Sequence, residues 1–145
     1  MKAENIKFRA KRTDDGAWVY GDLAHVHRIN TKEQAEQSGR RTEPVVRVAY
    51  SDVDEDTIGQ YTGFKDENGR EIYEGDIIQR ESWGILKSMP VIWDGGAFCA
   101  KNDKLKIIWP LKAYCLKEND LSPFKVVGNI YDNPELLKKE HERIG

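Results

Sequence analysis

The chain has 145 residues, a length that favours one domain or two very small ones. Its hydrophobic fraction of 39% and aromatic fraction of 10% exclude a disordered chain, because disordered chains are poor in aromatic residues. The net charge is −2 and is spread evenly, which excludes the basic tail or basic half typical of many nucleic-acid-binding proteins. A local basic face stays compatible with this charge.

The number of cysteines and the length of the apolar segments indicate the cellular compartment. Cys99 and Cys115 are the two cysteines, and they lack C-x-x-C spacing. We expect two reduced core thiols rather than a disulfide framework. The N-terminus has no apolar stretch fit for a signal peptide, and no run approaches the roughly 18 apolar residues of a membrane span. The sequence therefore predicts a cytoplasmic protein.

The first predicted unit is a β-hairpin. Apolar and basic residues alternate over 5–12, the period of a half-buried strand, with Ile6, Phe8 and Ala10 on one face and Lys7, Arg9 and Lys11 on the other. Asp15-Gly16 favours a tight turn. A second strand follows over about 17–23, with Trp18 and Tyr20 on one face.

Residues 30–41 differ from the strands around them. Thr31 and Gln34 form a capping-box pattern, and Gly39 is a helix stop signal. Ala35 is the apolar residue between them. The segment is interpreted as a short exposed helix or an ordered loop, the best place for partner-facing structure.

A strand is predicted over 44–50, with Val46, Val48 and Tyr50 on one face. An acidic loop at 52–56 leads into a further strand at 58–64. Asn68-Gly69 is the strongest turn signal in the chain, and it predicts a positive φ at Gly69.

Short strands continue beyond that turn. They are expected at 72–80, 91–93, 97–101, 105–109, 111–116 and 124–131, with a turn at 94–96. This spacing is typical of a barrel or a sandwich. One helix is expected over 134–144, with Asn133 as its N-cap and Pro134 in its first turn. Leu136, Leu137 and Ile144 would dock it, and His141 would lie on it without a visible partner.

Several blocks of the sequence resemble the YopX family of phage and prophage proteins. The blocks are residues 58–66, 68–69, 72–78 and 126–137, supported by 6–10, 91–93 and 96–98. The region 24–50 matches poorly. The signature residues are Gly59, Gln60, Tyr61, Thr62, Gly63, Asn68, Gly69, Gly75, Asp76, Gly128, Asn129, Tyr131, Asn133 and Pro134. The resemblance implies a prophage-encoded, chiefly β protein of unknown biochemical function, and it brings no catalytic residues.

The expected fold is mostly β, a small barrel or pseudo-barrel of short antiparallel strands with one short C-terminal helix. The Gly75-Asp76 step entering a strand is similar to SH3-like barrels, which predicts an SH3-like C-terminal half. We expect a single domain over 1–145, with possible β sub-halves at 1–64 and 65–132.

Metal sites are not expected. Asp52, Asp54 and Asp56 have the 1-3-5 spacing of a calcium loop, but Thr57 and Gly63 occupy the positions that need Gly and Glu. A solvated acidic turn is the simpler interpretation. His25 and His27 would share one strand face, where zinc would require two more ligands. The sequence predicts no cofactor.

Catalytic frames are also lacking, since no G-x-S-x-G, G-x-G-x-x-G or phosphate-binding loop occurs. Three hypotheses about function remain open.

The first is a non-enzymatic phage accessory protein that acts as a binding or assembly module. We expect it to be a homo-oligomer that associates through its β surface rather than its helix. The second is a nucleic-acid-binding accessory protein that uses the basic face Lys7, Arg9, Lys11 and Arg12 with Trp18 or Tyr20 beside it. A looser basic cluster lies at Lys101, Lys104 and Lys106. The third is an enzyme with a site assembled across strands.

Overall fold

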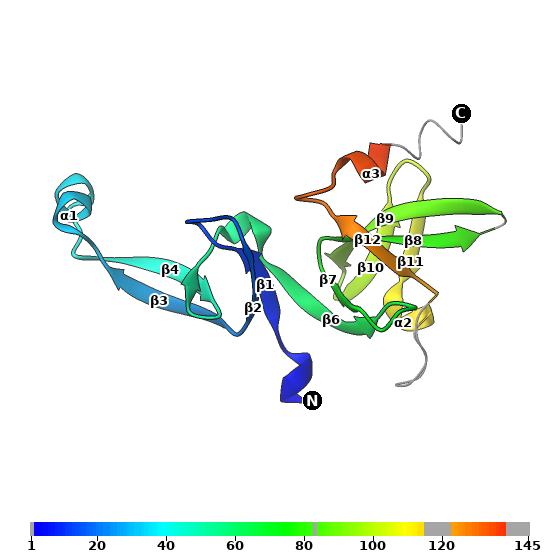
Figure 1. Ribbon diagram of the computed structural model, residues 1–145, viewed down its shortest axis with the longest axis horizontal. Helices are drawn as coiled ribbons and strands as arrows, with labels where there is room; N and C mark the ends of the chain where they lie inside the picture. Colours follow the sequence, from blue (N-terminus) through cyan, green and yellow to red (C-terminus); the bar gives the residue numbers. More distant parts are fainter. Residues whose placement is uncertain (1, 83, 115–122, 139–145) are drawn as a thin grey trace. The chain divides into compact units, whose positions relative to one another are not determined.

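The computed structural model describes residues 2–82, 84–114 and 123–138 and shows a mostly β protein built from antiparallel strand pairs (Figure 1). The predicted fold class is thereby confirmed at this level. The chain divides into two compact units, Met1–Ile58 and Gly59–Gly145. No helix in the described part of the chain is long and apolar enough to cross a membrane.

The first unit contains two hairpins and short helical turns. Its elements are η1 (Ala3–Asn5), β1 (Phe8–Lys11), β2 (Trp18–Gly21), β3 (Leu23–Ile29), α1 (Lys32–Ser38), β4 (Thr42–Val48), β5 (Ser51–Asp52) and η2 (Glu55–Thr57). The β1–β2 hairpin is confirmed: Arg9 pairs with Tyr20, and Gly16 closes the turn at a φ of +70°. Glycine suits this position because a positive φ costs it no steric strain.

A second hairpin forms a long two-stranded ribbon. β3 pairs with β4 along seven residue pairs, and α1 is inserted at the far end of the ribbon (Figure 1). The predicted capping box is present, since Thr31 Oγ1 accepts from the Gln34 amide and the Gln34 side chain accepts from the Thr31 amide. Gly39 ends the helix in the left-handed region. The segment 30–41 therefore contains a helix, and none of its residues is buried.

The core of the first unit is small. Ala10, Val48 and Val53 are buried at its centre. Partly buried apolar residues surround them, namely Phe8, Val19, Leu23, Val46, Ala49 and Ile58. The core lies at the base of the ribbon, because the residues of β3 and β4 beyond Leu23, Val46 and Val48 do not contribute to it.

The second unit is built around a five-stranded sheet. Its elements are β6 (Gly59–Lys65), β7 (Glu71–Tyr73), β8 (Asp76–Ser82), β9 (Ile85–Asp94), β10 (Ala97–Asn102), β11 (Ile107–Pro110), α2 (Leu111–Tyr114), β12 (Lys125–Asn129) and α3 (Glu135–Lys138). The sheet order is β11-β10-β9-β8-β12, so consecutive strands are neighbours and the last strand returns beside β8. The predicted turn at 94–96 joins β9 to β10. β6 and β7 form a hairpin outside this five-stranded sheet, and its turn places Gly69 at a φ of +81° as predicted.

One face of this sheet carries the larger core. The buried residues are Ile72, Ile78, Met89, Val91, Ala100, Trp109, Leu111, Phe124 and Val126. Trp109, Tyr114 and Phe124 form a three-ring cluster with centroids 5.7 to 6.3 Å apart. Such aromatic contacts add about 1 kcal/mol each beyond area burial.

The strand predicted over 111–116 is wrong where the structure describes it. Residues Leu111–Tyr114 form the helical turn α2. Residues three apart in a helix share one side, whereas in a strand they point to opposite faces. The helical turn therefore lets Leu111 and Tyr114 both reach the aromatic core.

The face prediction for Tyr50 is also wrong. β4 ends at Val48, and Ala49 and Tyr50 both adopt positive φ values, 52° and 66°. They form a tight turn into β5, since Val48 pairs with Ser51. Tyr50 is thereby fully exposed instead of sharing a strand face with Val46 and Val48.

The predicted C-terminal helix begins as expected, and α3 covers Glu135–Lys138. The amide of Leu136 donates to the carbonyl of Asn133, which starts the helical turn. Leu136 and Leu137 are both partly buried. The positions expected for His141 and Ile144 lie outside the described residues, as does Cys115.

Candidate functional site

The signature glycines permit close approaches of the chain to itself. A Cβ on Gly59 would overlap the carbonyl oxygen of Glu74, and a Cβ on Gly128 would lie 2.5 Å from Oδ1 of Asn133. Gly75 has a φ of +89°, and its amide donates to Val91 while its carbonyl accepts from Ile130. These glycines therefore carry structural constraints of the second unit.

Two buried carboxylates organise backbone in the same unit. Asp66, 1% exposed, accepts from the amides of Asn68 at 2.9 Å and Arg70 at 2.8 Å through one oxygen, and from Val126 at 3.1 Å through the other. Asp76 accepts from the amide of Tyr73 at 2.7 Å. Asp66 thus joins the β6–β7 turn to β12, and Asp76 fixes the entry into β8.

The remaining signature residues also make structural contacts within the second unit. Thr62 Oγ1 donates to the carbonyl of Ile72, and the rings of Tyr61 and Tyr73 lie 5.5 Å apart. Asn129 Oδ1 accepts from the amides of Tyr131 and Asp132, which builds the turn leading to Asn133 and Pro134. Gln60 accepts from the Glu74 amide through its carbonyl, and Gly63 has a φ of +86°. The signature thus describes how the second unit folds.

The basic face of β1 is only partly a solvent face. The Arg9 side chain is 4% exposed, and its guanidinium lies 4.8 Å from the centre of the Trp18 ring. The Lys11 ammonium lies 5.5 Å from the same ring. Cations stacked on an aromatic face in this way stabilise the hairpin itself. Lys7 is partly exposed, and Tyr20, paired with Arg9, is 53% exposed.

Metal-binding candidates do not assemble in the described residues. His25 and His27 are exposed on one face of β3, opposite Val46 and Pro44. Asp54 caps η2 by accepting from the Asp56 amide. No group of three or more His, Cys, Asp or Glu residues suited to a metal ion occurs in the part of the chain described.

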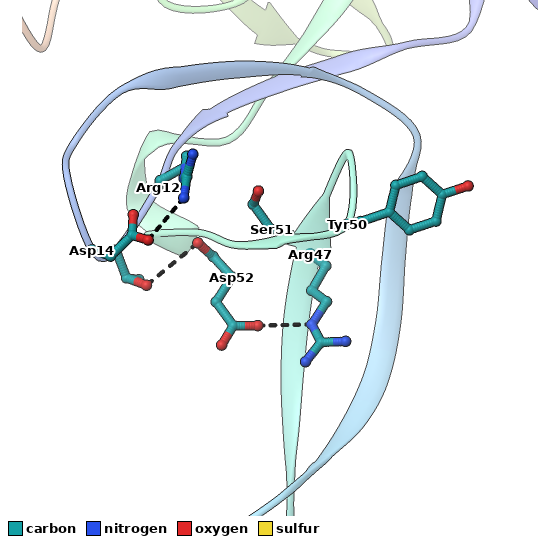
Figure 2. Close-up of a pocket in the computed structure, with 7 residues that line it drawn as sticks. Arg12, Asp14, Arg47, Tyr50, Ser51 and Asp52 are labelled. Carbon is teal, nitrogen blue, oxygen red and sulfur yellow. Dashed lines mark hydrogen bonds and ion pairs between the residues drawn. The ribbon is translucent and has the colours of Figure 1, made fainter.

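A polar pocket opens beside the β4–β5 turn (Figure 2). Its volume is about 280 Å³, and it is lined by Arg12, Thr13, Asp14, Arg47, Tyr50, Ser51 and Asp52. Arg47 Nε donates to Asp52 at 2.8 Å, and Arg28 lies 3.3 Å from the other Asp52 oxygen. The hydrogen bond from Arg47 holds the pKa of the Asp52 carboxyl below its ordinary value.

This pocket is a set of mutually neutralised charges. Arg12 is held by Asp14 at 2.8 Å, and Arg28 also reaches Glu43 at 3.4 Å. The ionised Asp52 cannot serve as a general acid at neutral pH. Its lining contains no histidine, lysine or cysteine. The geometry therefore indicates a polar surface of paired charges.

The turn above the pocket stores conformational strain. Left-handed backbone is unfavourable for residues other than glycine, asparagine and aspartate, and Ala49 and Tyr50 are adjacent exceptions. A Cβ on Gly21 would lie 3.1 Å from the Ala49 Cβ, so small residues are needed where β2 meets this turn. Figure 2 shows the Tyr50 ring pointing away from the ion pairs of Asp52. Strained residues that display an exposed side chain are typical of interaction sites.

The β3–β4 ribbon presents an exposed β surface in the first unit. No residue of β3 is buried, and Val48 at the base is the buried residue of β4. Ile29 is 82% exposed at the far end. An isolated two-stranded hairpin is marginally stable in water, so such a ribbon gains most from a partner.

Sequence reasoning missed a cation–aromatic cluster on the second unit. The Arg80 guanidinium lies 4.4 Å from the Tyr114 ring centre and 5.3 Å from that of Trp109, and Lys87 lies 5.9 Å from Trp109. Arg80 and Lys87 are cross-strand partners of β8 and β9. Only the strand register could have brought these residues together.

The thiol of Cys99 lies in the sheet and is 3% exposed. Burial raises the pKa of this thiol, which keeps it protonated and unreactive at neutral pH. The prediction of a reduced core thiol is therefore confirmed for Cys99.

The described residues define a mostly β protein of two units, in which the signature motifs build turns and close approaches of the second unit. The family model described as YopX protein matches residues 7–138, and the chain belongs to the YopX family. Among solved structures, it is similar to the crystal structure of protein EF1440 from Enterococcus faecalis. That match has 22% sequence identity and a TM-score of 0.52, and covers 91% of this chain and 97% of that one. No curated protein matches the chain.

Proposed function

We propose that this chain is a non-enzymatic binding or assembly module that self-associates through the β surface of its first unit. The observation that supports it is the β3–β4 ribbon, which contains no buried residue beyond Val48 at its base and carries Ile29 at 82% exposure. Ordering the part of the ribbon that lies beyond the core of the first unit costs conformational entropy, which contacts with a second chain would offset.

The polar pocket supports the same proposal. Its arginines and carboxylates pair with one another, so it offers a polar wall to a protein surface. Tyr50 lies beside the pocket, and its aromatic side chain is fully exposed. Tyrosine is enriched in the cores of protein interfaces.

The setting of this activity is also part of the proposal. Membership of the YopX family supports a prophage accessory role, and the buried Cys99 thiol supports the cytoplasm of a bacterial host. For the second unit we propose an SH3-like arrangement. The sheet order places the last strand beside the first, and the helical turn α2 precedes that last strand.

Light scattering at micromolar concentration tests the module. We expect a mass of at least twice 16.7 kDa. Replacing residues 25–46 by Asn-Gly shortens the ribbon at a hydrogen-bonded pair and should return the mass to that of one chain. Deleting residues 134–145 is the control, and it should leave the oligomer intact. If only the deletion of residues 134–145 gives a monomer, the interface lies in the C-terminal segment and not in the ribbon.

A second candidate function is single-stranded nucleic-acid binding. It is favoured by Tyr20, which is 53% exposed and pairs with Arg9 beside Trp18 and Lys11. Aromatic rings beside cations are typical of stacking platforms for bases. Fluorescence anisotropy with a labelled oligonucleotide tests it: binding that weakens with salt and with Tyr20→Ala supports it, and no binding at low salt excludes it.

A further inference from the structure

The outer edge of β3 can be assigned residue by residue from the ribbon's hydrogen bonds. β3 is the terminal strand of the order β3-β4-β5. At the two ends of the ribbon, Ala49 N donates to Asp22 O and Asn30 N donates to Arg41 O. Hydrogen-bonded pairs alternate with non-hydrogen-bonded ones, so the even-numbered residues of β3 bond to β4. The residues that direct their backbone N–H and C=O groups outward are Leu23, His25, His27 and Ile29.

The opposite edge of the ribbon is blocked. Pro44 pairs with His27 at a non-hydrogen-bonded position, so its ring nitrogen lies on the outer edge of β4. Proline has no N–H to offer there, and β5 covers Arg47 and Val48 on the same edge. β3 contains no proline, and its edge is therefore the one able to accept another strand.

We propose that two copies of this chain pair antiparallel through their β3 edges, about a two-fold axis at Val26. The inference rests on the proposed self-association and names its surface. In this register each outward residue faces an outward residue of the second copy, so that the ladder of hydrogen bonds continues across the axis. The result is a four-stranded sheet, β4-β3-β3-β4, with the same surface used by both copies.

The second copy is the favoured occupant because the edge complements itself along all seven residues. Val26 faces Val26 of the second copy, and Val45 lies beside each of them, which makes a row of four valines across the sheet. Leu23 faces Ile29 of the second copy and covers the side chain that is 82% exposed. Apolar cross-strand pairs of this kind stabilise a sheet.

The polar side chains fit the same register. His25 faces His27 of the second copy, and both lie on the uncharged face of the ribbon. Arg28 faces Ala24 of the second copy and keeps its ion pairs with Glu43 and Asp52. No like charges are directly opposed, so the pairing meets no electrostatic penalty of that kind.

Cysteine cross-linking tests the register. Val26 occupies a non-hydrogen-bonded pair of the new interface, where Cα atoms lie about 4.5 Å apart, within the range of a disulfide. Val26→Cys should give a covalent dimer on mild oxidation. Ala24→Cys is the matched control: its two copies would lie about 14 Å apart along the strands and should not cross-link. The wild type controls for Cys99 and Cys115.

Two substitutions at His27 test the backbone pairing. His27→Pro removes an outward N–H without touching the β3–β4 ladder, and it should reduce the mass by light scattering to one chain. His27→Ala keeps the N–H and should remain dimeric. Circular dichroism checks that each variant is folded. If His27→Pro is unfolded, the cross-linking of Val26→Cys alone decides whether the β3 edges pair.

The outcomes separate this inference from the proposed function. A wild type of 16.7 kDa overturns both. An oligomer in which Val26→Cys fails to cross-link overturns the β3 pairing and leaves self-association standing. Equal cross-linking of Ala24→Cys overturns the register. A monomer that acquires a strand from another protein in its place also overturns pairing between copies.

Discussion

At the scale of single residues, backbone conformation makes the sharpest predictions. Gly69 has a φ of +81°, and a Cβ there would meet nothing within 4 Å. A substitution at Gly69 is therefore expected to cost stability only through strain of its left-handed backbone conformation. Gly69→Val should lower the free energy of unfolding by about 1 kcal/mol or more, because a β-branched residue is strained in this region.

Thermal unfolding measures the effect, with Gly69→Asn as the matched control, since asparagine tolerates the left-handed conformation. Gly69→Asn should unfold close to the wild type. An equal melting temperature for Gly69→Val and the wild type would contradict the hairpin turn.

Tyr50 is expected to respond in the opposite direction. Its φ of 66° is strained for tyrosine, and its fully exposed ring buries no surface that a substitution would lose. Tyr50→Gly should raise the free energy of unfolding by about 0.5 kcal/mol, because relief of left-handed strain exceeds the entropy cost of glycine. Chemical denaturation measures it. A destabilised variant would mean that the ring packs against other residues of the chain or of a second copy.

At the scale of elements, Asp66 ties a turn to a strand 60 residues away. Its carboxylate accepts from three backbone amides and is buried. Asp66→Asn replaces one acceptor oxygen by a donor that faces a backbone N–H, so we expect a loss of about 2 kcal/mol in unfolding free energy. Glu67→Gln, at an exposed neighbour, is the control and should be neutral. Equal stability of the two variants would contradict this role.

Asp52 makes the stability of the first unit depend on pH. Its pKa is lowered from 3.8 in the folded state, mainly by the hydrogen bond from Arg47. A depressed carboxyl pKa contributes stability that is complete above the unfolded value and is lost as the pH falls through the folded value.

The difference in unfolding free energy between wild type and Asp52→Asn should therefore be about 1 kcal/mol at pH 7 and should shrink below pH 3.8. Denaturation at a series of pH values measures it. A difference that stays constant into acid would show that the ion pairs with Arg28 and Arg47 do not form.

Local signals in the sequence account for most of the elements. Asp15-Gly16, Asn68-Gly69 and Asp94-Gly95 each predict a turn by a local backbone preference, and each turn is present. The capping box at Thr31 works in the same way. The helical turn α2 could not be predicted, because Leu111 and Tyr114 adopt it to reach a core contributed by distant strands.

The candidate site was less accessible to sequence reasoning. Ala49 and Tyr50 continue an apolar alternation that predicts a strand, and neither has the usual preference for a left-handed turn. Arg9 alternates like a solvent-facing residue, yet it is buried on Trp18. Both outcomes depend on long-range packing that periodicity does not contain.

At the scale of the whole molecule, the two units differ in what their described residues do. The signature residues build turns and close approaches of the second unit, whereas the ribbon, the Tyr50 turn and the polar pocket belong to the first. The family model spans both units, since it matches residues 7–138. Under the proposed function, the second unit is a scaffold and the first is the unit that meets partners.

Association of this chain with copies of itself through the first unit would be visible in its mass in solution. Light scattering of the purified wild type at micromolar concentration should give at least twice the 16.7 kDa of one chain, falling to one chain when residues 25–46 are replaced by Asn-Gly. A wild-type mass of 16.7 kDa across that concentration range would contradict the account.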